Sequence, residues 1–185
     1  MPEKPEPIRI DRFVEKRFNL TIQYEQLPEG LLGYSRFGIK GVEAVVITQS
    51  LDEEGTVSAA RRVRTTIAHE AGHCLLHAHL FATQRQSKKI FESGHDATPR
   101  VLCRDNNQEL VGKRRSYQGD WWEYQANMVM SSLLMPRVLV QKAIRPYLEI
   151  MGELGSKREE AVAVLAEIFD VNPVVARIRL SDLYR

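Results

Sequence analysis

The chain is constrained most by one long run of helical periodicity that carries three histidines, in the stretch TTIAHEAGHCLLH at residues 65–77. Apolar and small side chains recur at helical spacing from Ser58, the expected N-cap, to about Ala82. One face of this helix must therefore pack against other elements. Gly72 costs about 1 kcal/mol relative to alanine in a helix interior, which indicates that a neighbouring element approaches the helix closely there.

His69, Glu70 and His73 form an HExxH pattern inside this helix. Residues four apart on an α-helix lie one turn on and about 40° round, so His69 and His73 can bind one ion. Imidazole suits Zn²⁺, and a catalytic zinc site takes three protein ligands and leaves one position for water. Glu70 follows the first ligand and can act on that water as a general base. The alternative is a helix whose histidines form a partly exposed polar face.

A third ligand has to come from elsewhere in the chain, and Glu123 is the best candidate. It begins the stretch EYQANMVMSSLLMP, whose periodicity predicts a helix with Asp120 as a plausible cap and Pro136 at its end. On that helix Glu123 shares the core-facing side with Ala126, whose small side chain would let two helices approach. The alternative is a first-turn glutamate that the helix dipole favours. Spacing alone leaves both interpretations open.

The order of elements predicts an α+β fold, because strands come first and helices follow. A short amphipathic helix is expected at residues 10–20. Segments rich in β-branched and aromatic residues at 20–28, 30–38 and 42–51 predict a small antiparallel sheet. Residues 84–119 contain eight basic and four acidic residues and no clear periodicity. They predict a long basic loop, and long loops in compact domains often serve a function.

The length of 185 residues and the 43% hydrophobic content suit one packed domain. We expect residues 1–140 to form it and residues 141–185 to add a helical extension packed on it, divided at Pro146 among other places. The segment AVAVLAEIFDVNPVVARIRLSDL resembles a helix-turn-helix, with Pro173 opening the second helix. That helix begins with apolar residues where base recognition needs polar ones, and the net charge is only +2. We therefore expect no direct binding to nucleic acid.

Together, TTIAHEAGHCLLH and EYQANMVMSSLLMP resemble the ImmA/IrrE family of zinc metallo-endopeptidases, whose motifs read close to TLAHELGHxLLH and ExxANxFAxxLLMP. The resemblance covers roughly residues 8 to 140 and implies a compact zincin-like domain. It implies that His69, His73 and Glu123 bind Zn²⁺ and that Glu70 is the catalytic base. It further implies a protein substrate, typically a helix-turn-helix transcriptional repressor.

The chain departs from the family pattern in two places. Val129 and Met130 replace the phenylalanine and alanine of the second motif, which changes packing but not the metal ligands. The segment between the motifs is longer than in the shorter family members and includes the basic GKRRS and an isolated Cys103. These features predict altered access of the substrate.

Several further residues are weaker candidates. His77 continues the histidine stripe and is either a support for a ligand or a half-buried structural residue. Candidates for stabilising a developing oxyanion are Tyr117, Tyr124 and His95. Cys103 is an idle thiol by default and a latent zinc ligand as the alternative.

Two other classes of function compete with the peptidase. One is a regulatory module that binds protein or DNA and has a structural or vestigial zinc site. The other is a zinc hydrolase that acts on a small amide. No apolar stretch reaches the length of a membrane span or of a secretory signal, and the two cysteines form no disulfide framework. These features predict a cytoplasmic protein without a membrane segment.

Overall fold

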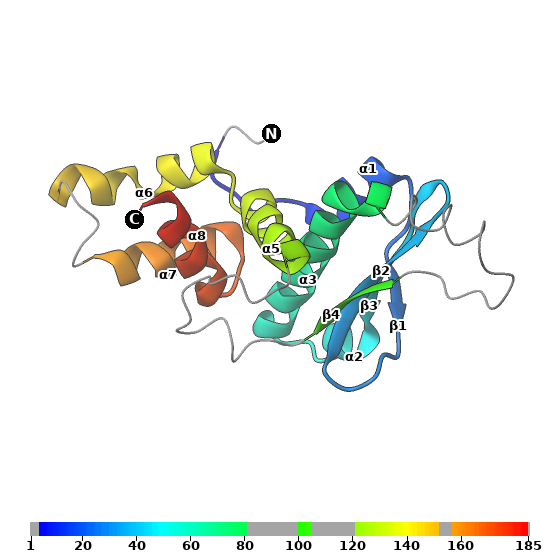
Figure 1. The fold of residues 1–185 in the computed structure, drawn as a ribbon. Helices are drawn as coiled ribbons and strands as arrows, with labels where there is room; N and C mark the ends of the chain where they lie inside the picture. The colour runs from blue at the N-terminus through cyan, green and yellow to red at the C-terminus, as the bar shows by residue number, and fades with distance from the viewer. Residues whose placement is uncertain (1–3, 81–99, 105–120, 152–156, 185) are drawn as a thin grey trace, which may run out of the picture.

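The computed structural model describes residues 4–80, 100–104, 121–151 and 157–184, and it has an α+β fold as expected. A long helix, α3 (Val57–Leu76), lies between a small sheet and a second helix, α5 (Trp121–Leu134), as Figure 1 shows. The remaining C-terminal helices lie on the far side of this helix pair from the sheet. Within the described ranges, no helix is both long and apolar enough to cross a membrane.

The sheet has the strand order β1-β3-β2-β4 and is mixed. Its strands are β1 (Gln23–Glu25), β2 (Leu31–Gly38), β3 (Gly41–Thr48) and β4 (Arg100–Arg104). The expectation of a purely antiparallel sheet is wrong, because β1 pairs in parallel with β3. The chain reverses between β1 and β2 and again between β2 and β3. Since β3 lies between the other two strands, it runs parallel to β1 and antiparallel to β2.

Strand β4 lies inside residues 84–119, for which we expected a continuous loop. It pairs antiparallel with β2, with Tyr34 opposite Leu102 and Ser35 opposite Val101. That segment is rich in charge but alternates little, so its pairing depends on β2 rather than on a pattern of its own. The other residues of the range, 84–99 and 105–119, lie outside the described part of the chain.

The N-cap of helix α3 lies two residues earlier than the sequence indicates. The side chain of Thr56, not of Ser58, caps it by accepting a hydrogen bond from the backbone N–H of Ala59 at 3.0 Å. The helix ends at Leu76, earlier than the expected Ala82. Two short helices, α1 (Ile10–Phe18) and α2 (Gln49–Glu53), pack against it.

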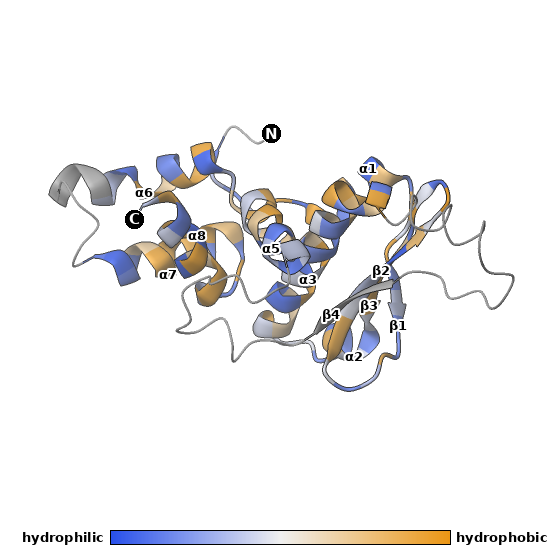
Figure 2. Cartoon of the chain, viewed as in Figure 1, coloured by the Kyte–Doolittle hydropathy of each residue, from blue (hydrophilic) through white to orange (hydrophobic). Residues whose placement is uncertain are grey.

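The C-terminal part contains α6 (Arg137–Met151), α7 (Arg158–Phe169) and α8 (Pro173–Leu183). Pro146 lies inside α6 instead of dividing it, on an exposed position where water can satisfy the carbonyl that lacks a donor. Apolar and hydrophilic residues alternate along α5 and α7, as expected for helices with one buried face (Figure 2). One continuous core joins both parts of the chain, with Val63, Met130, Leu165 and Leu180 among its members.

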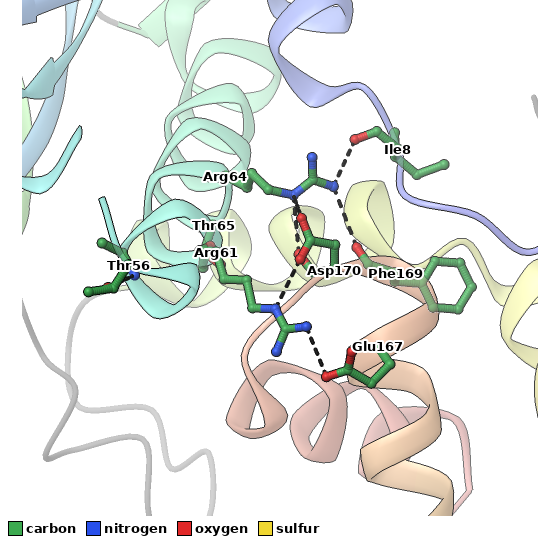
Figure 3. A network of polar contacts seen from close by, with 9 residues as sticks. Ile8, Thr56, Arg61, Arg64, Thr65, Glu167, Phe169 and Asp170 are labelled. Atoms are coloured by element: carbon green, nitrogen blue, oxygen red, sulfur yellow. Dashed lines mark hydrogen bonds and ion pairs between the residues drawn. The ribbon is translucent and has the colours of Figure 1, made fainter. Parts of the chain in front are cut away.

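A polar network fastens α3 to the turn that follows α7 (Figure 3). The guanidinium of Arg64 donates to the backbone carbonyls of Ile8 at 3.0 Å, Asp170 at 3.2 Å and Phe169 at 3.4 Å. Arg61 adds an ion pair with the Asp170 carboxylate at 3.0 Å. Asp170 has a left-handed backbone with φ of 50°, so this network stabilises the point where α7 ends.

Candidate metal centre

Helices α3 and α5 meet at a position where neither has a large side chain. A Cβ atom added at Gly72 would lie 2.8 Å from the carbonyl oxygen and 2.9 Å from the Cα of Ala126. The backbones therefore approach as closely as these two residues allow, as the glycine in the sequence predicts. This approach places the inward-facing side chains of both helices within reach of each other.

The predicted ligands His69, His73 and Glu123 come together at this helix pair. Their ligand atoms all lie within 4.8 Å of one another, so the three residues could hold a metal ion. The Nε2 atoms of His69 and His73 are 3.0 Å apart. They lie 3.1 Å and 3.2 Å from the two carboxylate oxygens of Glu123. Both histidines are buried, whereas the Glu123 side chain is 38% exposed and keeps one side of the cluster open to solvent.

The protonation states of Glu123, His69 and His73 depend on one another. Burial alone would raise the pKa of Glu123, but hydrogen bonds and charges from the two histidines lower it well below its usual range. Burial lowers the pKa of His69, yet contacts with Glu123 and the charge of Glu70 raise it overall. The pKa of His73 is lowered, mainly by burial. Glu123 is thus a carboxylate at neutral pH, and its contact with His69 favours the protonated form of that imidazole.

Glu70 lies beside the cluster in the interface between α3 and β2. It is fully buried, and its Oε2 accepts a hydrogen bond of 2.5 Å from the hydroxyl of Ser35. Its Oε1 is buried and has no hydrogen-bond partner among the residues that the structure describes. Burial raises the pKa of this carboxyl to about 7, even though His69 and Ser35 favour the charged form. Glu70 therefore combines one fixed oxygen with one unoccupied oxygen.

Four residues around the ligands were assigned no role from the sequence: Ser35, Trp122, Gln125 and Asn127. Asn127 lies 3.1 Å from Nδ1 of His69 through its side-chain oxygen. It follows Glu123 by four residues, a helical spacing that could have identified it. Gln125 and Trp122 contact His77 instead. Ser35 is one serine in a strand, and nothing in the sequence marks it as a partner of Glu70.

His77 contacts the candidate ligand His73 and is buried rather than half-buried. Its Nδ1 lies 3.0 Å from Nδ1 of His73, and its ring stacks on Trp122 with centroids 5.1 Å apart. Among the other candidates, Tyr124 stacks on Trp121 at 5.4 Å, as a packing residue would. His95 and Tyr117 lie outside the described residues. Cys103 lies in β4, but its side chain is not among the described parts.

Comparison with known proteins gives no relative from which a function could be transferred. No protein-family model, curated protein or solved structure matches this chain. The function is therefore inferred from the chemistry of the cluster, in which two imidazoles and a carboxylate converge on one point next to a buried carboxyl group.

Proposed function

We propose that this protein is a zinc-dependent endopeptidase in which His69, His73 and Glu123 hold the metal. The observation that carries the proposal is the convergence of ligand atoms from three residues next to Glu70, whose buried carboxyl interacts electrostatically with His69 and Glu123. Ligands about 2.0–2.1 Å from a tetrahedral zinc ion lie roughly 3.3 Å from one another. The two Nε2 atoms are 3.0 Å apart, and each lies 3.1 or 3.2 Å from a different oxygen of Glu123, so the shortest separations are close to that value.

Glu70 is the general base of the proposed reaction. When bound, zinc lowers the pKa of water and polarises the carbonyl of the scissile peptide bond. Oε1 of Glu70 accepts the proton of the attacking water and then donates it to the nitrogen of the leaving amine. Ser35 occupies Oε2 and so holds the carboxyl group in one orientation. A carboxyl pKa near 7 suits a group that must both accept and release a proton at neutral pH.

We further propose that the chain is an intracellular peptidase related to the ImmA/IrrE family and that it cleaves a helix-turn-helix repressor. The support is the resemblance of its two motifs, HEAGHCLLH and EYQANMVMSSLLMP, to those of the family. Because these motifs form the two helices that meet at Gly72 and Ala126, their pairing is consistent with one shared site.

A regulatory module with a structural zinc site is the competing candidate, and two observations disfavour it. A structural site needs no base, yet Glu70 is buried beside the ligands. Arginines on α8 are also engaged within the chain. Arg177 is paired with Glu159 at 2.5 Å, and Arg179 donates to the carbonyl of Met135 at 2.9 Å. A recognition helix would need such groups for DNA.

The test combines metal analysis with proteolysis. Wild type is expected to bind one zinc ion and to cleave a helix-turn-helix repressor encoded beside it, with casein as a general protein substrate. Glu70→Gln is expected to keep zinc and to lose at least 100-fold in kcat/KM. Glu160→Gln, an exposed position on α7, is the matched control and is expected to cleave normally. A wild type without zinc, or an active Glu70→Gln variant, contradicts the proposal.

Activity on small amides alone would support a zinc hydrolase of another kind. Salt-dependent DNA binding without proteolysis would support the regulatory module.

A further inference from the structure

We propose that two side-chain amides of α5, those of Gln125 and Asn127, set the tautomers of both histidine ligands, with His77 relaying the effect of Gln125. These amides are positioning residues, since neither contributes an atom to the cluster of His69, His73 and Glu123. The inference rests on the metal site of the proposed function but not on the peptidase reaction. It concerns which nitrogen of each imidazole has a free lone pair.

The first of the two amides, that of Asn127, acts on a histidine ligand directly. The side-chain oxygen of Asn127 lies 3.1 Å from Nδ1 of His69. An amide oxygen only accepts hydrogen bonds, so Nδ1 must carry the proton. A neutral imidazole has one N–H, which leaves Nε2 of His69 with a free lone pair. That nitrogen is the one in the metal cluster.

The second amide, that of Gln125, acts on His73 through His77. The side-chain oxygen of Gln125 lies 3.0 Å from Nε2 of His77, which must therefore be the protonated nitrogen of that ring. Nδ1 of His77 is then an acceptor, and it faces Nδ1 of His73 at 3.0 Å. Nδ1 of His73 consequently donates, and Nε2 of His73 is left with a free lone pair. Neighbouring histidines along this relay thus adopt opposite tautomers.

Both amides leave a free lone pair on Nε2 of a histidine in the cluster. Two Nε2 lone pairs face each other at 3.0 Å, and the carboxylate of Glu123 completes a set of acceptors. No neutral donor lies among these atoms, so only a cation or an added proton satisfies them. The amides of a single helix turn therefore prepare both imidazoles for a metal before it binds.

His77 is buried and its ring is fixed by stacking, so water does not take its place in the relay. Its side chain is 2% exposed. Its ring stacks on Trp122 with an angle of 30° between the planes. If the Gln125 amide turned over, its NH₂ group would donate to His77 and reverse every proton in the relay. Nε2 of His73 would then carry a hydrogen and could not bind a metal.

The tautomers can be read directly in the full-length wild type. Long-range ¹H–¹⁵N correlation spectra of the metal-free and zinc-loaded protein distinguish a protonated imidazole nitrogen from a bare one. We expect a proton on Nδ1 of His69 and His73 and on Nε2 of His77 in the zinc-loaded protein. We expect His77 to be the same without zinc. A proton on Nδ1 of His77 in either state would overturn the relay.

Variants of Gln125 test the consequence for metal affinity. Gln125→Met keeps the size of the side chain but cannot accept a hydrogen bond, and we expect zinc affinity to fall about 10- to 100-fold. Gln125→Glu can only accept, which fixes the relay in its metal-binding direction, and we expect affinity at least equal to that of wild type. Gln49→Met removes a distant glutamine that bonds Glu53, and it is the matched control. The probe is Zn²⁺ alone, measured by competition with a chromophoric chelator.

The outcomes separate the relay from the peptidase. Equal zinc affinity in Gln125→Met and wild type, or equal losses in Gln125→Met and Gln125→Glu, overturns the relay even if proteolysis is found. Weakened zinc binding in Gln125→Met alone supports the relay even if no protein is cleaved. If Gln125→Met does not fold, the spectra of the wild type still decide the question.

Discussion

Glu70 occupies an environment that a carboxylate normally avoids. It is completely buried, and within the described part of the chain one of its oxygens has no partner while the hydroxyl of Ser35 satisfies the other. A buried charge that is not fully paired costs free energy, so the folded protein favours the neutral form of this residue. A catalytic base needs such an unoccupied oxygen, and its presence at Glu70 has measurable effects on stability.

The stability of the metal-free protein should fall with rising pH because of Glu70. Burial raises its pKa from 4.5 to about 7 in the folded state. The stabilisation from the neutral form is complete below 4.5 and is lost as the pH rises through 7. Relative to Glu70→Gln, wild type should lose about 2 kcal/mol between pH 5 and pH 8. Urea unfolding at both pH values measures this difference.

Glu160→Gln serves as the control for that pH series, because Glu160 is exposed on α7. This variant also removes one carboxyl group, so comparison with it isolates the effect of burial at Glu70. A constant difference between Glu70→Gln and wild type would show that Glu70 is ionised in the folded protein at pH 5.

Ser35 should matter for stability because of the hydrogen bond to Glu70. Ser35→Ala leaves both oxygens of Glu70 without a partner, and we expect a loss of about 1–3 kcal/mol at pH 8. Ser131→Ala is a matched control, since this equally buried serine donates to the carbonyl of Met128 in its own helix. Urea unfolding of both variants tests the prediction. Equal losses in the two variants would contradict it.

At the scale of elements, the contact between α3 and α5 determines the geometry of the site. Gly72→Ala would place a methyl group less than 3.0 Å from the backbone of Ala126. We expect the overpacking to cost about 1–3 kcal/mol, which exceeds the gain of about 1 kcal/mol in helix propensity. The helices should also separate and weaken zinc binding, because Glu123 lies on α5.

Ser58→Ala, at an exposed position of α3, is the control for this substitution and should not destabilise the protein. Urea unfolding and zinc titration measure the two effects of Gly72→Ala. A stabilised Gly72→Ala variant with normal zinc affinity would show that α5 does not approach α3 as described.

The helices that carry the site could be predicted from the sequence, whereas the sheet could be predicted only in part. Helical spacing in one chain segment brings His69 and His73 together, whereas spacing alone left the role of Glu123 open and the resemblance of the motifs selected it. The closeness of Gly72 to another helix also follows from its cost in a helix interior. Strand pairing depends on contacts between distant segments, so the parallel β1 and the strand β4 could not be predicted.

The same limit explains why Ser35 could not be identified from the sequence as the partner of Glu70. Ser35 reaches Glu70 because β2 packs against α3, and the two residues are 35 positions apart. Hydrogen bonds across such distances have no local signature. Asn127 is different, since its distance of four residues from Glu123 is visible in the sequence.

At the scale of the whole molecule, Arg64 joins three parts of the chain. Its guanidinium donates to carbonyls of Ile8, Phe169 and Asp170, and only 18% of its side chain is exposed. Arg64→Met removes these bonds, and we expect a loss of about 2–3 kcal/mol. Arg177→Met removes an exposed ion pair with Glu159 and should change stability little. Thermal unfolding of both variants compares them, and equal changes would contradict the prediction.

The candidate metal ligands and Ser35, the hydrogen-bond partner of Glu70, belong to different layers of the molecule. His69, His73 and Glu123 lie on two packed helices, but Ser35 lies on the sheet. A local opening that separates the sheet from α3 would therefore preserve the ligands and release Glu70 from Ser35. Amide hydrogen exchange would then be faster in β2 than in α3 of the zinc-loaded protein. Such an opening would produce a species that retains zinc but has lost the alignment of its base.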